Sequence, residues 1–230
     1  MLDSRSWFEC WRDPLEFFTA AHCKILSIPL GRSVPNYLGD AYVAGLFARI
    51  WNDYSECKVR IIPRPDQFPD GQLDDAGKIL DLEIVIADRK ERRMFAEHAE
   101  WERMRLHGEI PLVRTSGDAE TQQRRAQARE AISRVCEKKV IHYTGSTNSD
   151  TIIPASLLIY LNIGQVLSNP GTLLSVDEMV EFTQPYRNRF QSIWVLCGIE
   201  VVRTWPERKV LRATRDPFAG ARSSQMPTAS

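Results

Sequence analysis

The sequence predicts a single α/β domain in which a mixed β-sheet is flanked by helices. The stretch YLGDAYVAGLFARIWNDY (37–54) repeats apolar residues at intervals of three and four, which is typical of an amphipathic helix. The apolar runs ILDLEIVIAD (79–88), LLIYLNIG (157–164) and SIWVLCGIEVV (192–202) have the composition of buried strands. A chain of 230 residues can bury one substantial core and is short for two domains.

Three regions follow from the patterning. Residues 1–32 place aromatic side chains at the spacing of one helix face, which predicts a helical N-terminal arm that packs on the domain. Residues 33–211 form the α/β domain. Residues 212–230 lose the apolar pattern and are expected to be disordered. The aromatic residues of the arm are Trp7, Phe8, Trp11, Phe17 and Phe18.

Inside the domain, further elements can be placed from local signals. KVRIIP (58–63) is a short strand ended by proline, and RPDQFPDGQLDDAGK (64–78) has the Asp, Gly and Pro content of a turn. Two charged helices are expected over 89–107 and 118–139. In SVDEMVEFTQPY, Ser175 and Glu178 have the spacing of a capping box that begins a helix.

Composition excludes several classes of protein. Thirty basic residues balance thirty acidic ones, so no global positive field is present. Five scattered cysteines without a CxxC pair favour a reducing compartment. The apolar runs are too short to cross a bilayer, so we expect no membrane association and a cytoplasmic location. Phosphate-loop, dinucleotide-binding, serine-hydrolase and zinc-protease motifs do not occur.

The strand over 79–88 carries the most informative chemistry. Alternate side chains of a strand share a face, so Asp81 and Glu83 lie on the same side. Neighbouring carboxylates repel each other unless a cation lies between them, and hard cations prefer carboxylate oxygens. Asp70 could add a third oxygen ligand, which would suit Mg²⁺ (or Mn²⁺) and phosphodiester hydrolysis. Alternatively, Asp81 is solvated, Glu83 pairs with an arginine, and Asp70 is a turn residue.

Pro69-Asp70, followed by Asp81-Leu-Glu83 on a strand, resembles the PD-(D/E)XK nuclease superfamily. The resemblance covers the order of elements from about Tyr37 to Val202. It implies a restriction-endonuclease-like mixed central sheet flanked by helices, with magnesium at the acidic end. In this motif the lysine lies two residues after the second acid. If Glu83 is the second acid, Val85 occupies the lysine position. We prefer the alignment in which Asp81 is the second acid and Glu83 occupies the lysine position.

The resemblance also implies a basic residue near the acids and contacts to DNA phosphates. Lys90 and Lys139 are the two candidates for the missing catalytic lysine. Arg89, Arg92, Arg93 and Lys139 are candidate nucleic-acid-binding residues, although interspersed charge of this kind is more often a solvated helix face. The first helix of that fold often adds an acid to the metal site, and Asp40 is a weak candidate for it. We prefer to interpret Asp40 as an aspartate in the first turn of its helix, where its charge interacts favourably with the helix dipole.

The leading functional hypothesis is therefore a Mg²⁺-dependent endonuclease that hydrolyses DNA, with Asp70, Asp81 and Glu83 as metal ligands. The alternative is a catalytically inactive, nuclease-like binding or assembly module. A third hypothesis is a partner-binding protein that uses its aromatic N-terminal arm. The family resemblance also implies that the protein could form a homodimer. His142 and Tyr143 are interpreted as residues that end an element rather than as substrate contacts.

Overall fold

The computed structural model describes residues 4–29, 32–62, 69–88, 118–145, 151–161 and 174–215. The helices are α1 (Ser4–Phe8), α2 (Pro14–Ser27), α3 (Asn36–Asn52), α5 (Asp118–Thr144), α6 (Val176–Thr183) and the 3-10 helix η2 (Gln184–Arg189). The strands are β1 (Cys57–Ile61), β2 (Gly71–Asp75), β3 (Lys78–Ala87), β4 (Ile153–Leu161), β5 (Phe190–Cys197), β6 (Glu200–Trp205) and β7 (Lys209–Arg212).

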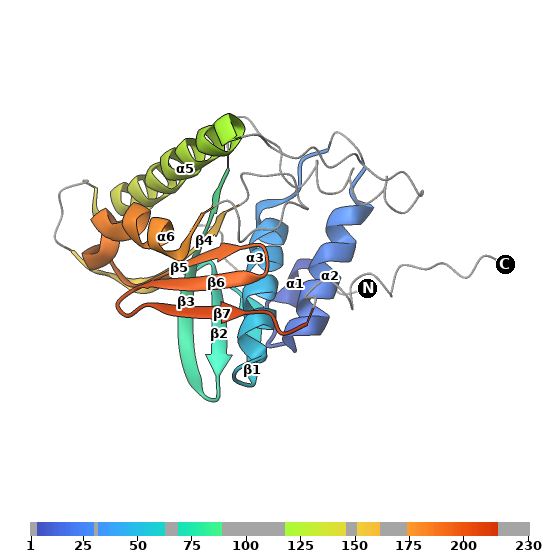
Figure 1. The fold of residues 1–230 in the computed structure, drawn as a ribbon. Coiled ribbons are helices and arrows are strands. Elements are labelled where there is room, and N and C mark those ends of the chain that lie inside the picture. The colour runs from blue at the N-terminus through green and yellow to red at the C-terminus, as the bar shows by residue number, and fades with distance from the viewer. Residues whose placement is uncertain are drawn as a thin grey trace.

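The strands form one mixed sheet of seven, hydrogen-bonded in chain order from β1 to β7 (Figure 1). β1, β2 and β3 are antiparallel to one another, and so are β5, β6 and β7. Between these groups, β3, β4 and β5 run parallel. The mixed α/β class predicted from the sequence is confirmed, with the helices arranged around this sheet.

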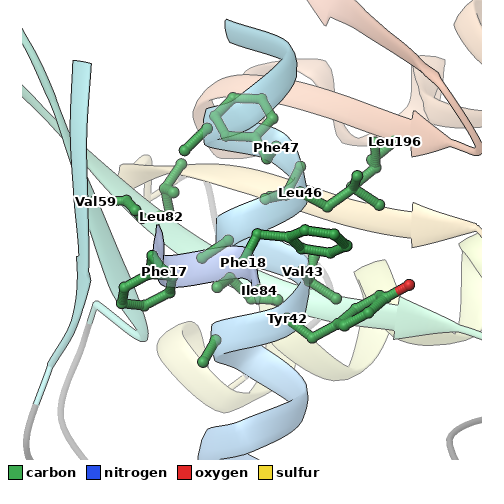
Figure 2. Packing of buried hydrophobic residues seen from close by; sticks show 14 of the residues in the cluster. Phe17, Phe18, Tyr42, Val43, Leu46, Phe47, Val59, Leu82, Ile84 and Leu196 are labelled. Atoms are coloured by element: carbon green, nitrogen blue, oxygen red, sulfur yellow. The ribbon is translucent and has the colours of Figure 1, made fainter. Parts of the chain in front are cut away.

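Helices cover both faces of the sheet. On one face α1, α2 and α3 pack against alternate residues of the central strands, among them Leu82, Ile84 and Leu196 (Figures 1 and 2). On the other face α5 and α6 pack against Val85 and its neighbours on β4 and β5. Because successive side chains of β3 alternate between these cores, Glu83 faces the α5 layer and Ile84 faces the α3 layer.

The N-terminal residues form part of the main core. Phe8, Phe17 and Phe18 are fully buried, and Figure 2 shows the two phenylalanines of α2 beside α3. The helices approach closely at Gly45, where an added Cβ would lie 2.9 Å from the Cα of Phe18. The carboxylate of Asp13 accepts hydrogen bonds from the first turn of α2, which caps that helix.

Three local predictions need correction. The stretch interpreted as a turn contains the strand β2, because β1 and β3 pair with it on both sides and bury Leu73. The run 192–202 is a hairpin rather than one strand, since Gly198, at a φ of 61°, lies in the connection between β5 and β6. The helix expected to end near residue 139 continues to Thr144. The capping box of Ser175 and Glu178 is confirmed.

Some predictions fall outside the described residues, including the helix over 89–107 and most of the C-terminal tail. Among the helices that the structure describes, none combines the length and apolar character required to span a bilayer.

Candidate functional site

Strand β2 pairs with only part of β3, because β3 is the longer strand. β2 begins at Gly71, which pairs with Leu82, whereas β3 continues to Ala87. The edge of β3 beyond Leu82 is therefore not covered by β2. The backbone N–H of Ile84 points to this edge and donates to Oδ2 of Asp70 at 2.9 Å. Side chains from both helical layers can meet here.

Asp70 and Glu83 are neighbours because of the strand register. Gly71 lies opposite Leu82 in the antiparallel pair, so the preceding residue, Asp70, falls opposite Glu83. Directly opposed side chains of such a pair share a face and lie close together. Glu83 is 1% exposed, and Asp70 remains partly accessible. The strand register thus holds two carboxylates close together although their charges repel each other.

Helix α5 supplies the groups that neutralise them. The ammonium of Lys139 contacts Oε1 of Glu83 and lies 3.5 Å from Oδ2 of Asp70. One turn further along, the hydroxyl of Tyr143 donates to Oε2 of Glu83 at 2.8 Å. Residues four apart on a helix project from the same face, so both side chains reach the sheet together. Both oxygens of the buried Glu83 carboxylate are therefore occupied.

The protonation equilibria follow from this crowding. Burial raises the pKa of Glu83, and the charge of Asp70 raises it further, against the opposing influence of Lys139. For Lys139, burial lowers the pKa, but Asp70 and Glu83 together outweigh burial, so its pKa is raised. Lys139 is accordingly charged at neutral pH and is the counterion of this pair.

Asp40 approaches the same place from α3, on the opposite side of the sheet. It lines a cavity of about 280 Å³ together with Asp70 and Lys139. Burial and then the nearby charge of Asp70 raise the pKa of Asp40 from 3.8 to about 7. The preferred interpretation of Asp40 as a first-turn residue is wrong, because the first turn of α3 contains no acidic residue.

Asp81 lies on the same face of β3 but has different partners. Its Oδ1 accepts a hydrogen bond from Nε2 of Gln72 at 2.7 Å, and Oε1 of Gln72 accepts from Arg60. The guanidinium of Arg60 lies 4.4 Å from the centroid of the Trp11 ring. These residues form a row across β1, β2 and β3. The structure thus brings Glu83, and not Asp81, into contact with the lysine that also contacts Asp70.

In the described part of the chain, no group of three or more His, Cys, Asp or Glu side chains is arranged to hold a metal ion. Magnesium nevertheless commonly binds through one or two carboxylates and keeps several waters. Asp70 and Glu83 provide such a pair of hard oxygen ligands, and Asp40 lines the adjoining cavity. The side-chain hydrogen bonds of Asp70 to Ile84 and Lys139 both use Oδ2. The donor set therefore fits magnesium, provided that Lys139 yields its position between the carboxylates.

Lys90, Arg89, Arg92 and Arg93 lie outside the described residues. Lys139 lies at the centre of the site. The sequence alone gave no basis for choosing between Lys90 and Lys139. Tyr143 was interpreted as ending an element; its position four residues after Lys139 on a helix was the available signal.

Comparisons of the chain with protein-family models, with curated proteins and with solved structures found no match.

Proposed function

We propose that this chain is a magnesium-dependent nuclease that hydrolyses DNA, built on a restriction-endonuclease-like core. The observation that carries the proposal is the convergence of Asp70, Glu83 and Lys139 at the edge of β3 that lies beyond its pairing with β2, beside a cavity that Asp40 also lines. An acidic pair with an adjacent ammonium can hold a metal ion and stabilise the charge that develops on a phosphodiester during hydrolysis.

The order of elements supports the same fold. A helix (α3) precedes three antiparallel strands, and a further helix (α5) leads to β4, which is parallel to β3. The first aspartate of the motif would be Asp70 and the second acid Glu83. The lysine expected at Val85 would be replaced by Lys139, which reaches the same carboxylates from α5.

Each residue then has a defined task. Asp70 and Glu83 would hold the ion, with Asp40 close enough to contribute. When bound, magnesium would neutralise charge on the phosphate and lower the pKa of a water molecule. Lys139 would leave the carboxylates and place its ammonium against the developing phosphate charge. Tyr143 would keep the Glu83 carboxylate in one orientation through its hydrogen bond.

A second function is favoured by one observation. The ammonium of Lys139 already contacts both carboxylates, as an internal cation would in a domain that has lost its metal. Such a domain would be a nuclease-like binding module without catalysis. Calorimetric titration with magnesium and manganese distinguishes the two: binding heat that disappears in Asp70→Asn supports the nuclease, and no heat with either ion supports the module.

The direct test is cleavage of labelled DNA in magnesium or manganese. Asp70→Asn and Glu83→Gln should abolish cleavage while the circular-dichroism spectrum stays unchanged. Asp81→Asn is the matched control, because its carboxylate bonds to Gln72 and should leave cleavage largely intact. Metal-dependent cleavage that survives in both Asp70→Asn and Glu83→Gln would show that the assignment is wrong.

A further inference from the structure

The cavity beside Asp70 has a second wall, which the proposed hydrolytic chemistry does not use. This wall combines apolar side chains from the sheet, Ile61, Ile62 and Ile84, with Tyr37 from α3 and Arg5 from α1. The guanidinium carbon of Arg5 lies 5.8 Å from the centroid of the Tyr37 ring. Acidic and basic groups therefore face an aromatic and aliphatic surface across one small space.

The position of Arg5 is fixed from two directions. Its Nε lies 3.5 Å from Oε1 of Glu9, one helical turn away, and its guanidinium lies over Tyr37. A planar guanidinium held in this way can stack on a flat ring and donate to a phosphate. The N-terminal segment thus contributes a cation to the wall of the same cavity that Asp70 lines.

Resting on the proposed function, we propose that this cavity binds one unpaired nucleotide of the DNA substrate, so that the preferred substrate is single-stranded or frayed at its end. The base would pack on Ile62 and the ring of Tyr37, and the phosphates on its two sides would lie toward Lys139 and Arg5. Aromatic and guanidinium surfaces stack on any base, which gives affinity without sequence preference.

The size of the cavity decides between an unpaired and a paired substrate. A volume of about 280 Å³ lies just below the range of pockets for drug-sized ligands, about 300 to 1,000 Å³, and suits a group no larger than one nucleotide. A base pair within a duplex cannot enter such a space unless one base leaves the stack, which costs a few kcal/mol. A strand that is already unpaired avoids that cost, so it should bind more tightly.

The test measures fluorescence anisotropy of labelled DNA on the full chain, with calcium replacing magnesium because both ions bind carboxylate oxygens. A short single strand should bind at least about tenfold more tightly than a blunt duplex of the same sequence, and Tyr37→Leu should remove about tenfold of that affinity. Tyr37→Phe, which keeps the ring, should bind like the unaltered chain. Tyr54→Leu is the matched control, since Tyr54 lies beyond the opposite end of α3.

Arg5→Ala should lower single-strand affinity and reduce the slope of log affinity against log salt by about 0.7, the value for one lost phosphate contact. Arg208→Ala, which removes an exposed arginine outside the cavity, should leave the slope unchanged. Equal binding of the blunt duplex, or full affinity in Tyr37→Leu, would overturn the inference. Absence of cleavage in magnesium, with this binding pattern intact, would instead count against the proposed function.

Discussion

The hydroxyl of Tyr143 lies 2.8 Å from Oε2 of Glu83 and donates to a carboxylate that is almost wholly buried. A buried acceptor that loses its donor keeps the cost of desolvation without compensation. The pairing therefore bears on both the stability of the domain and the orientation of a proposed metal ligand.

Replacing Tyr143 with phenylalanine removes only this donor. We expect the free energy of unfolding in urea to fall by about 1 to 3 kcal/mol, the usual cost of an unsatisfied buried group. Under the proposed function, manganese affinity measured by calorimetry should also fall about tenfold, because a residue that orients a metal ligand is lost. Tyr186→Phe, which removes a hydroxyl from the neighbouring α5–η2 contact, is a control for general loosening of α5. Unchanged stability would contradict the importance of the Tyr143 hydrogen bond.

Lys139→Met should leave Asp70 and Glu83 facing each other without the ammonium that α5 supplies. We expect a loss of about 2 to 4 kcal/mol in the free energy of unfolding at pH 8, because breaking a buried pair leaves an uncompensated charge. The loss should shrink as the pH is lowered, since protonation of the raised-pKa Glu83 removes one of the two charges. Denaturant titrations of both proteins at pH 5 and pH 8 check this. An equal loss at both values would show that the effect is one of packing alone.

Asp40 predicts a pH dependence of the stability of the unaltered protein. Its pKa is raised in the folded state, from 3.8 to about 7, so the folded state holds its proton more tightly than the unfolded state. Stability should therefore decline as the pH rises from about 4 to about 7. Asp40→Asn, which stays neutral, should flatten this decline and raise the unfolding free energy at pH 8 by about 1 to 3 kcal/mol. Thermal denaturation of both proteins between pH 4 and pH 8 tests this prediction. A variant less stable than the parent at pH 8 would contradict it.

Gly45→Ala tests the contact between α2 and α3. Alanine favours a helix over glycine by about 1 kcal/mol, so an exposed site would be stabilised. At Gly45 the new methyl would lie 2.9 Å from the backbone of Phe18 and 3.1 Å from Phe17. Because overpacking typically costs about 1 to 3 kcal/mol, we expect a net loss of up to about 2 kcal/mol and a lower Tm. A higher Tm would mean that the helices can separate without cost.

The features that the sequence predicted correctly depend on local signals. The strand that carries Asp81 and Glu83 shows an uninterrupted apolar run, and the helix after Ser175 begins with a complete capping box. Both patterns are sufficient without knowledge of distant residues. By contrast, β2 has the composition of a turn, and it is a strand because β1 and β3 pair with it on both sides.

The candidate site depended more strongly on tertiary structure. Periodicity placed Asp81 and Glu83 on one face, but only the register of β2 with β3 sets Asp70 opposite Glu83. The choice of Lys139 as the neighbouring cation depends on where α5 crosses the sheet, which no local pattern specifies. Asp40 lies on the other helical layer, so its relation to Asp70 could not be read from either segment alone.

The acids and the lysine that meet beside β3 are synthesised at different times. The acids at 40, 70 and 83 leave the ribosome well before Lys139, and the helix that carries the lysine must then fold onto the completed strand. A chain released early, or cut before α5, would hold mutually repelling acids with no cation from this helix to balance them. Helix α5, which is made after all three acids, therefore completes this arrangement of charges, and products truncated before α5 should lack the arrangement altogether.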